Sequence, residues 1–189
     1  MNKNLRVPYG LSVHGSDEIR AVTKVLKSST QMGKNVSIFE KKISKLFDKR
    51  YGLMVNSGSS ALLLAMETLD FPPGSEIITP ALTFSTTVGY IVKNNWTPVF
   101  VDVEEGTYCI NESKIKNLIT KKTKAVVAPH LMGNIVNWDR VAPVLKKKGI
   151  LIIEDSADTL GATYKKKSTG HHADISITSF YGCLLYTSD

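Results

Sequence analysis

Between residue 51 and about residue 178, short apolar segments suited to β-strands alternate with longer segments of helical periodicity. The expected strands are 52–55, 76–79, 98–103, 125–129, 150–153 and 175–178. The expected helices are 59–69, 83–94, 112–119 and 139–148. Strands that alternate with helices in this way form parallel sheets covered on both faces. The sequence therefore favours an α/β fold, a three-layer α/β/α domain with a mostly parallel sheet.

Two amphipathic segments precede the alternating region. Apolar residues recur in them at helical spacing, which predicts one helix from about residue 16 to 27 and a second over about 36–46. The apolar positions are Ile19, Val22 and Leu26 in the first, and Val36, Phe39, Ile43 and Leu46 in the second. We expect both stripes to face the core.

Composition narrows the classes of partner. The formal charge is +7, from 24 Lys and Arg against 17 Asp and Glu, but the lysines are scattered and no aromatic interleaving accompanies them. This pattern favours solvated faces over a nucleic-acid footprint. No apolar run approaches the roughly 20 residues of a membrane helix. The two cysteines, Cys109 and Cys183, have neither a disulfide framework nor metal-ligand spacing, so we expect no metal and a reducing cytoplasm.

A glycine flanked by hydroxyl residues opens the helix expected at 59–69. In the segment Asn56-Ser57-Gly58-Ser59-Ser60-Ala61, backbone N–H groups and the helix dipole would favour an anion such as a phosphate at Gly58 and Ser59. No Gly-x-Gly-x-x-Gly or Gly-Lys-Ser/Thr loop is present, which suits a phosphate monoester better than a pyrophosphate. A Ser/Gly helix start without a ligand is an equally weighted alternative.

A pair of carboxylates ends the strand expected at 150–153. Glu154 and Asp155 should point to opposite faces, and ligands gather at the carboxyl ends of parallel strands. A partly desolvated Asp155 carboxylate is costly unless it meets a cation, and the pyridinium N–H of pyridoxal phosphate (PLP) is such a cation. In the alternative, Asp155 caps the next helix or accepts bonds from backbone amides.

Two further side chains follow expected strands. Phe84 could stack on a cofactor ring, although a lone aromatic residue is more often part of a core. His130 could be functional, and a satisfied, buried histidine is at least as compatible with its position.

These motifs together resemble the N-terminal half of the DegT/DnrJ/EryC1/StrS sugar aminotransferase family, which has the PLP fold type I. The resemblance covers about residues 33–182, in the family's order and spacing. The matching segments are Gly33, Phe39-Glu40, 55–61, 73–80, Thr83-Phe84, 98–103, 123–125, 130–133, 153–155 and 179–181.

The resemblance implies a cofactor site. Gly58 and Ser59, helped by Ser179, would hold the phosphate of PLP or of pyridoxamine phosphate (PMP). Phe84 would stack on the ring, and Asp155 would pair with the ring nitrogen. The resemblance also implies a homodimer for the full-length parent protein.

Asp158 stands where many aminotransferases of the family have Gln or His near the ring hydroxyl. This departure resembles the branch of hexulose 3-dehydratases. The family resemblance thus implies one of two activities on a nucleotide-linked 4-keto-6-deoxy sugar in polysaccharide or deoxysugar biosynthesis. One is a PLP-dependent transamination with a donor such as glutamate, and the other is a PMP-dependent removal of the 3-hydroxyl.

Position 184 should decide between them, because the family has lysine there in aminotransferases and histidine in dehydratases. This chain has Leu184, which can neither carry the cofactor covalently nor remove a proton. Residues 183–189 depart from the family pattern, and we interpret them as a non-native tail.

The expected organisation is an N-terminal helical segment at 1–32 and an incomplete PLP-binding large domain at 33–182, with the small C-terminal domain missing. Such a fragment would be inactive. Two other readings remain open: a non-catalytic PLP-fold binding or regulatory protein, and a nucleotide-binding α/β module.

Overall fold

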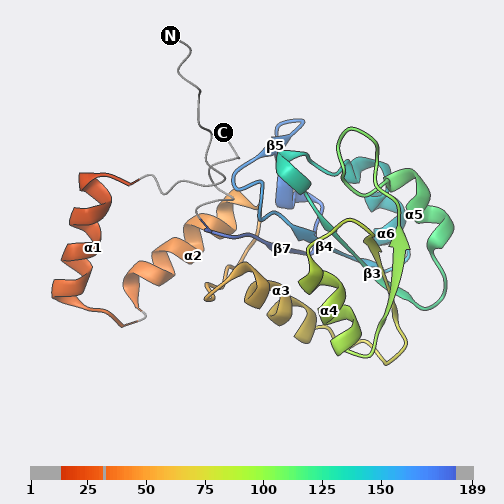
Figure 1. Cartoon of the computed structure of the whole chain (residues 1–189), viewed down its shortest axis with the longest axis horizontal. Helices are drawn as coiled ribbons and strands as arrows, with labels where there is room; N and C mark the ends of the chain where they lie inside the picture. Colours follow the sequence, from red (N-terminus) through yellow and green to blue (C-terminus); the bar gives the residue numbers. More distant parts are fainter. Residues whose placement is uncertain (1–13, 32, 182–189) are drawn as a thin grey trace, which may run out of the picture.

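A computed structural model describes residues 14–31 and 33–181. Its centre is a five-stranded parallel sheet with the strand order β2-β1-β3-β4-β7 (Figure 1). The strands are β1 (Glu76–Pro80), β2 (Thr97–Val101), β3 (Thr123–Pro129), β4 (Leu151–Asp155) and β7 (Ile175–Ile177). A short antiparallel hairpin pairs β5 (Thr163–Tyr164) with β6 (Lys167–Ser168). The parallel sheet confirms the predicted fold class.

Helices cover both faces of the sheet. The α-helices are α1 (Ser16–Ser28), α2 (Lys34–Leu46), α3 (Gly58–Glu67), α4 (Ser85–Lys93), α5 (Glu112–Leu118) and α6 (Ala142–Lys147). Short 3-10 turns lie at η1 (Leu131–Gly133), η2 (Trp138–Arg140) and η3 (Thr169–His171). None of the helices in the described part of the chain is long and apolar enough to cross a membrane.

Alternation along the strands builds two separate cores. Successive residues of a strand point to opposite faces, so Ile152 of β4 joins one core and Ile153 the other. The Ile153 core includes Leu62 of α3 and Ile91 of α4. The Ile152 core includes side chains of α5 and α6. The α3 and α4 helices therefore share one face of the sheet, and α5 and α6 the other.

Several element boundaries differ from the sequence expectation. Residues 52–55 form no strand, because this segment is tied to α2: a Cβ at Gly52 would lie 2.7 Å from the Glu40 carbonyl oxygen, and the Met54 amide donates to the Glu40 carboxylate. The helix expected at 139–148 is shorter and preceded by η2. Pro143 lies in its first turn, where the missing N–H costs nothing.

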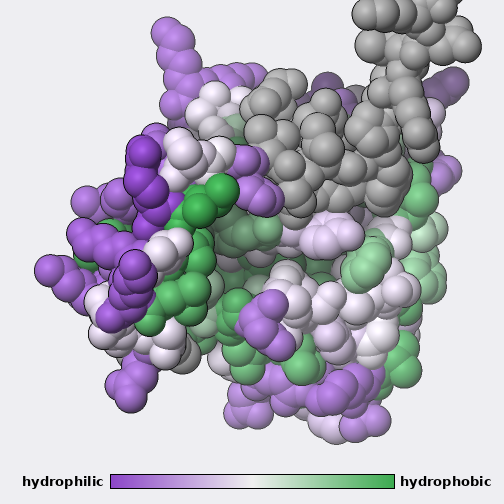
Figure 2. All heavy atoms as spheres, turned by 60° about the vertical axis from the view of Figure 1, so that its left-hand side comes forward, coloured by the Kyte–Doolittle hydropathy of each residue, from purple (hydrophilic) through white to green (hydrophobic). Residues whose placement is uncertain are grey.

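The expectation that both N-terminal stripes face the core is wrong for α1. Its apolar side chains Ile19, Val22 and Leu26 are 59%, 58% and 67% exposed, and the helix has no buried residue. Helix α1 projects from the body of the molecule (Figure 1), and Figure 2 shows exposed apolar atoms gathered in a band on this side. In α2 only Ser44 is buried.

A close backbone approach joins the end of α2 to η3. A Cβ at Gly170 would lie 2.0 Å from the carbonyl oxygen of Phe47, so only glycine fits there. Beside this contact, the Lys49 ammonium donates to the carbonyl oxygens of Gly170, at 2.6 Å, and of Ala173. Burial lowers the pKa of Lys49, and the charge of Glu154 opposes that shift.

We expect Gly170→Ala to destabilise the fold by about 1–3 kcal/mol or more, because a backbone atom blocks the new methyl group. Gly89→Ala is the matched control. Gly89 lies within α4 with open space around its Cβ position, and alanine there should stabilise by about 0.5–1 kcal/mol. Urea unfolding of the two variants measures the difference, and equal midpoints would contradict the proposed close packing.

Candidate functional site

The candidate residues lie at one edge of the sheet and on one of its faces. Asp155 ends β4, and by strand alternation its side chain lies on the same face as Ile153. That face is covered by α3, which begins at Gly58, and by α4, which Phe84 caps. The topology thus brings the two motifs of the sequence to a common region at the carboxyl ends of the strands.

The N-terminus of α3 offers backbone donors. Ser57 is the N-cap, and its hydroxyl oxygen accepts from the Ser60 amide at 3.1 Å. The amides of Gly58 and Ser59 donate no hydrogen bond to any other described residue. Free amides at a helix start, together with the helix dipole, form an anion-binding arrangement.

Gly58 and Ser179 lie against each other. Ser179 follows β7, and a Cβ at position 58 would lie 3.3 Å from the Ser179 Cβ and 3.6 Å from its hydroxyl oxygen. A larger residue at 58 would crowd this space, so glycine leaves the hydroxyl and the helix amides open together. Ser179 Oγ also accepts from the Tyr181 amide at 3.2 Å. The structure therefore joins two segments that the sequence separates by about 120 residues.

Asp155 is a half-buried carboxylate. Its Oδ1 atom accepts from the Ala157 amide at 3.0 Å, as the alternative reading of the sequence expected. Burial raises its pKa to about 6, and the negative charge of Asp158 adds to the shift. A cation placed against Asp155 would lower this pKa again, because an opposite charge favours the ionised form.

Asp158 holds the loop that follows β3. Its Oδ2 atom accepts from the Met132 amide at 2.9 Å. Met132 has a left-handed backbone conformation, with φ of 55°, which is strained for a residue with a side chain. The Asp158 carboxylate therefore stabilises an unusual turn at the same edge of the sheet.

Phe84 is the N-cap residue of α4, and its side chain is 64% exposed. The alternative that this aromatic residue belongs to the core is therefore wrong. It lies at the end of the segment that follows β1, two strands away from β4 in the sheet. Its exposed ring is available to stack on a planar ligand.

A buried network lies next to these residues. The buried position of His130 agrees with the second reading of that residue, and its contact with Glu154 was not predicted. Glu154 accepts from the Ser156 hydroxyl at 2.6 Å, and its Oε2 atom lies 3.0 Å from His130 Nε2. The His130 Nδ1 atom accepts from the Val136 amide at 3.0 Å. His130 is thus a buried histidine with both ring nitrogens in contact. The sequence offered one signal for this contact: His130 and Glu154 lie at the ends of two strands that pair in the sheet.

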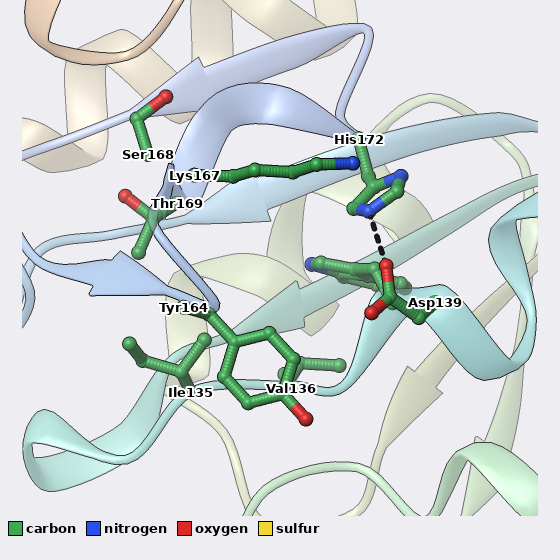
Figure 3. Close-up of a pocket in the computed structure, with 9 residues that line it drawn as sticks. Ile135, Val136, Asp139, Tyr164, Lys167, Ser168, Thr169 and His172 are labelled. Carbon is green, nitrogen blue, oxygen red and sulfur yellow. Dashed lines mark hydrogen bonds and ion pairs between the residues drawn. The ribbon is translucent and has the colours of Figure 1, made fainter.

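The pocket drawn in Figure 3 is separate from the candidate cofactor site. It lies between the loop after β3 and the β5–β6 hairpin, and it contains none of the predicted site residues. Figure 3 shows His172 pointing toward Asp139, at 2.7 Å between Nε2 and Oδ1. A cavity of about 10 Å³ accommodates one water molecule at most. This pocket cannot be the site of a cofactor.

The family model of the DegT/DnrJ/EryC1/StrS aminotransferase family matches residues 13–188. The chain belongs to this family. Among curated proteins, it is 37% identical over 182 residues to dTDP-4-dehydro-2,6-dideoxy-D-glucose 3-dehydratase of Saccharopolyspora spinosa, covering 92% of this chain and 39% of that protein.

Solved structures agree with this membership. A variant of GDP-4-keto-6-deoxymannose-3-dehydratase with bound GDP-perosamine matches with a TM-score of 0.87 and 30% identity, over 94% of this chain and 48% of that chain. The PLP form of a putative sugar aminotransferase from Streptococcus pneumoniae matches with a TM-score of 0.87 and 28% identity. The match covers 95% of this chain and 50% of that chain. The chain spans about half the length of the proteins it matches.

The raised pKa of Asp155 predicts a pH-dependent stability difference. The native state binds a proton at this carboxyl more tightly than the unfolded chain does, so ionisation costs stability as the pH rises from about 4 to about 6. Asp155→Asn cannot ionise, and its side-chain oxygen can still accept from the Ala157 amide. We expect the variant to be more stable than the native chain by about 1–3 kcal/mol at pH 7.5.

Near pH 4 the two proteins should be equally stable. Urea unfolding across this pH range measures the difference, and a gap that does not change with pH would refute the raised pKa.

Proposed function

We propose that this chain is the cofactor-binding part of a PLP-dependent aminotransferase that acts on a nucleotide-linked 4-keto-6-deoxy sugar. The reaction would serve polysaccharide or deoxysugar biosynthesis, with a donor such as glutamate supplying the amino group. The observation that carries the proposal is the arrangement of the α3 N-terminus, Ser179 and Asp155 on one face and at one edge of the sheet.

The residues present fit the cofactor. The free amides of Gly58 and Ser59 and the hydroxyl of Ser179 match a phosphate monoester. Asp155 forms no ion pair with another described residue, and a protonated ring nitrogen would supply a partner of opposite charge. Phe84 offers the exposed aromatic face, and Asp158 would lie near the ring hydroxyl. When bound, PLP supplies an electron sink for reactions at the carbon attached to the transferred nitrogen.

Dehydration with PMP is the second candidate. It is supported by Asp158, which departs from the Gln or His of many aminotransferases in the family, and by two matched relatives named as 3-dehydratases. For either reaction, the chain's own residues would hold the phosphate, orient the ring and keep its nitrogen protonated. The catalytic position 184 and the tail 183–189 lie outside the described residues.

A non-catalytic binding role is the third candidate, since Leu184 can perform neither chemistry. A binding protein of this kind would use the same contacts to the cofactor phosphate and ring but would catalyse no reaction. We keep the cytoplasm as part of the proposal, since Cys109 is a buried, free thiol.

Substitution at position 184 tests the proposed site. After incubation with PLP and reduction with borohydride, Leu184→Lys should carry a cofactor adduct on residue 184, because the phosphate and ring contacts would place the PLP aldehyde beside the new amine. The native chain and Leu184→His should carry none on residue 184. Peptide mass spectrometry locates the adduct.

The control is the double variant Leu184→Lys, Gly58→Val, in which the valine side chain fills the space beside Ser179. Labelling of residue 184 should fall at least tenfold, which corresponds to about 1.4 kcal/mol of lost binding free energy. Labelling of residue 184 at the same level as surface lysines would refute the site. With nucleotide-linked 4-keto-6-deoxy sugar and glutamate, an aminated product of the lysine variant supports transamination. A 3-deoxy product from PMP and the histidine variant supports dehydration.

We also propose a homodimer. The exposed apolar residues Ile19, Val22 and Leu26 of α1 support it, since an isolated helix of this length is marginal in water and gains stability by docking. Light scattering should give twice the mass of the chain, and Val22→Glu should shift the protein toward the monomer. A monomeric native chain at micromolar concentration would contradict the proposal.

A further inference from the structure

The buried pair of Glu154 and His130 has no part in the cofactor contacts proposed above. Both side chains are almost fully inaccessible to solvent. By strand alternation, Glu154 lies on the face opposite to Asp155, on the side of Ile152 and the α5–α6 core. A carboxylate in such a place is costly unless specific partners compensate it, so its presence calls for a physical reason.

The hydrogen bonds of the imidazole determine where its proton is. The Val136 amide donates to Nδ1, and a nitrogen that accepts a hydrogen bond cannot carry a proton. Nε2 is therefore the ring nitrogen left to carry a proton, and it is the atom 3.0 Å from Glu154 Oε2. The N–H bond does not point straight at this oxygen, so the contact is mainly electrostatic. The Lys49 ammonium also interacts with the Glu154 charge.

The loop after β3 is attached at two points to β4 and to the segment that follows it. One is the bond from the Val136 amide to His130, whose own amide donates to the Asp155 carbonyl oxygen at 2.9 Å. The other is the bond from the Met132 amide to Asp158. Between them the chain makes the strained turn at Met132. Loss of either attachment would leave that turn with one support in place of two.

We propose that Glu154 and His130 form a positioning pair that holds the 131–136 loop at the carboxyl edge of the sheet. Glu154 keeps the imidazole proton on Nε2, and the bare Nδ1 atom then accepts the Val136 amide. The loop is thereby fixed beside Asp158, at the edge where Asp155 ends its strand. Glu154 and His130 act through the loop and do not contact the ligand themselves.

Nitrogen NMR of the 189-residue chain, without cofactor, tests the tautomer directly. At neutral pH the spectrum should show His130 with a protonated Nε2 and an unprotonated Nδ1, and the Val136 and Met132 amides should exchange slowly with solvent. A proton on Nδ1, or a charged imidazolium, overturns the proposal. This measurement needs no variant, so it stays decisive even where substitutions prevent folding.

Two substitutions of His130 separate positioning from packing. In His130→Asn the side-chain oxygen can replace Nδ1 as the acceptor, so exchange of the Val136 amide should remain slow. In His130→Gln the side-chain amide replaces Nε2 instead, and exchange of the Val136 amide should accelerate about tenfold or more, as expected for the loss of one buried hydrogen bond. Equal exchange rates in the two variants would show that the pair does not position the loop.

Glu154→Gln tests the charge. Without the carboxylate, the Nδ1–H tautomer should become detectable and the Met132 amide should exchange faster. An unchanged tautomer in this variant would overturn the role of Glu154.

Binding of free PLP gives a further readout: it should weaken about tenfold in His130→Gln relative to His130→Asn. Weakening in His130→Gln and not in His130→Asn supports positioning, whereas equal affinity in both, or the reverse order, overturns the link from the loop to the site.

Discussion

The parallel pairing of β3 with β4 is the constraint on which the rest of this structure depends. It runs in register from Ala125 opposite Leu151 to Pro129 opposite Asp155. Because β4 is buried on both faces, its alternating residues enter both cores. Its last two residues, Glu154 and Asp155, are carboxylates on opposite faces of the strand end. One of these carboxyl groups enters the candidate site, and the other enters the interior.

The two carboxyl groups at the end of β4 have different surroundings because they lie on opposite faces of the sheet. Asp155 is partly accessible and keeps a raised pKa because burial disfavours its charge. Glu154 is inaccessible and is surrounded by Ser156 and His130 instead. The helices that begin at Gly58 and after Phe84 cover the Asp155 face, so anion donors, an aromatic surface and a carboxylate share one region. The order of the strands therefore brings these groups, which lie far apart in the sequence, to the same edge of the sheet.

Much of the sheet could be predicted from the sequence, since β1, β3 and β4 contain the apolar runs 77–78, 125–129 and 151–153, which suit strands covered on both faces. The helix start at Gly58 follows from local chemistry as well. The failures have a common cause. The run at 52–55 has strand-like composition, yet its Met54 amide bonds to the side chain of Glu40, a partner that no local pattern reveals. The apolar stripe of α1 has helical spacing, but spacing does not say what covers it.

The sequence by itself determined most of the elements and the two motifs, because periodicity, capping and the strand-end acids are local properties. The order of the motifs along the chain carried the resemblance to the family whose model matches residues 13–188. Only the tertiary structure decided that Gly58 lies against Ser179, that Asp158 supports Met132, and that Glu154 meets His130. Each of these contacts joins segments brought together by strand order and by close packing. Such contacts depend on three-dimensional distance, which the spacing of residues along the chain does not contain.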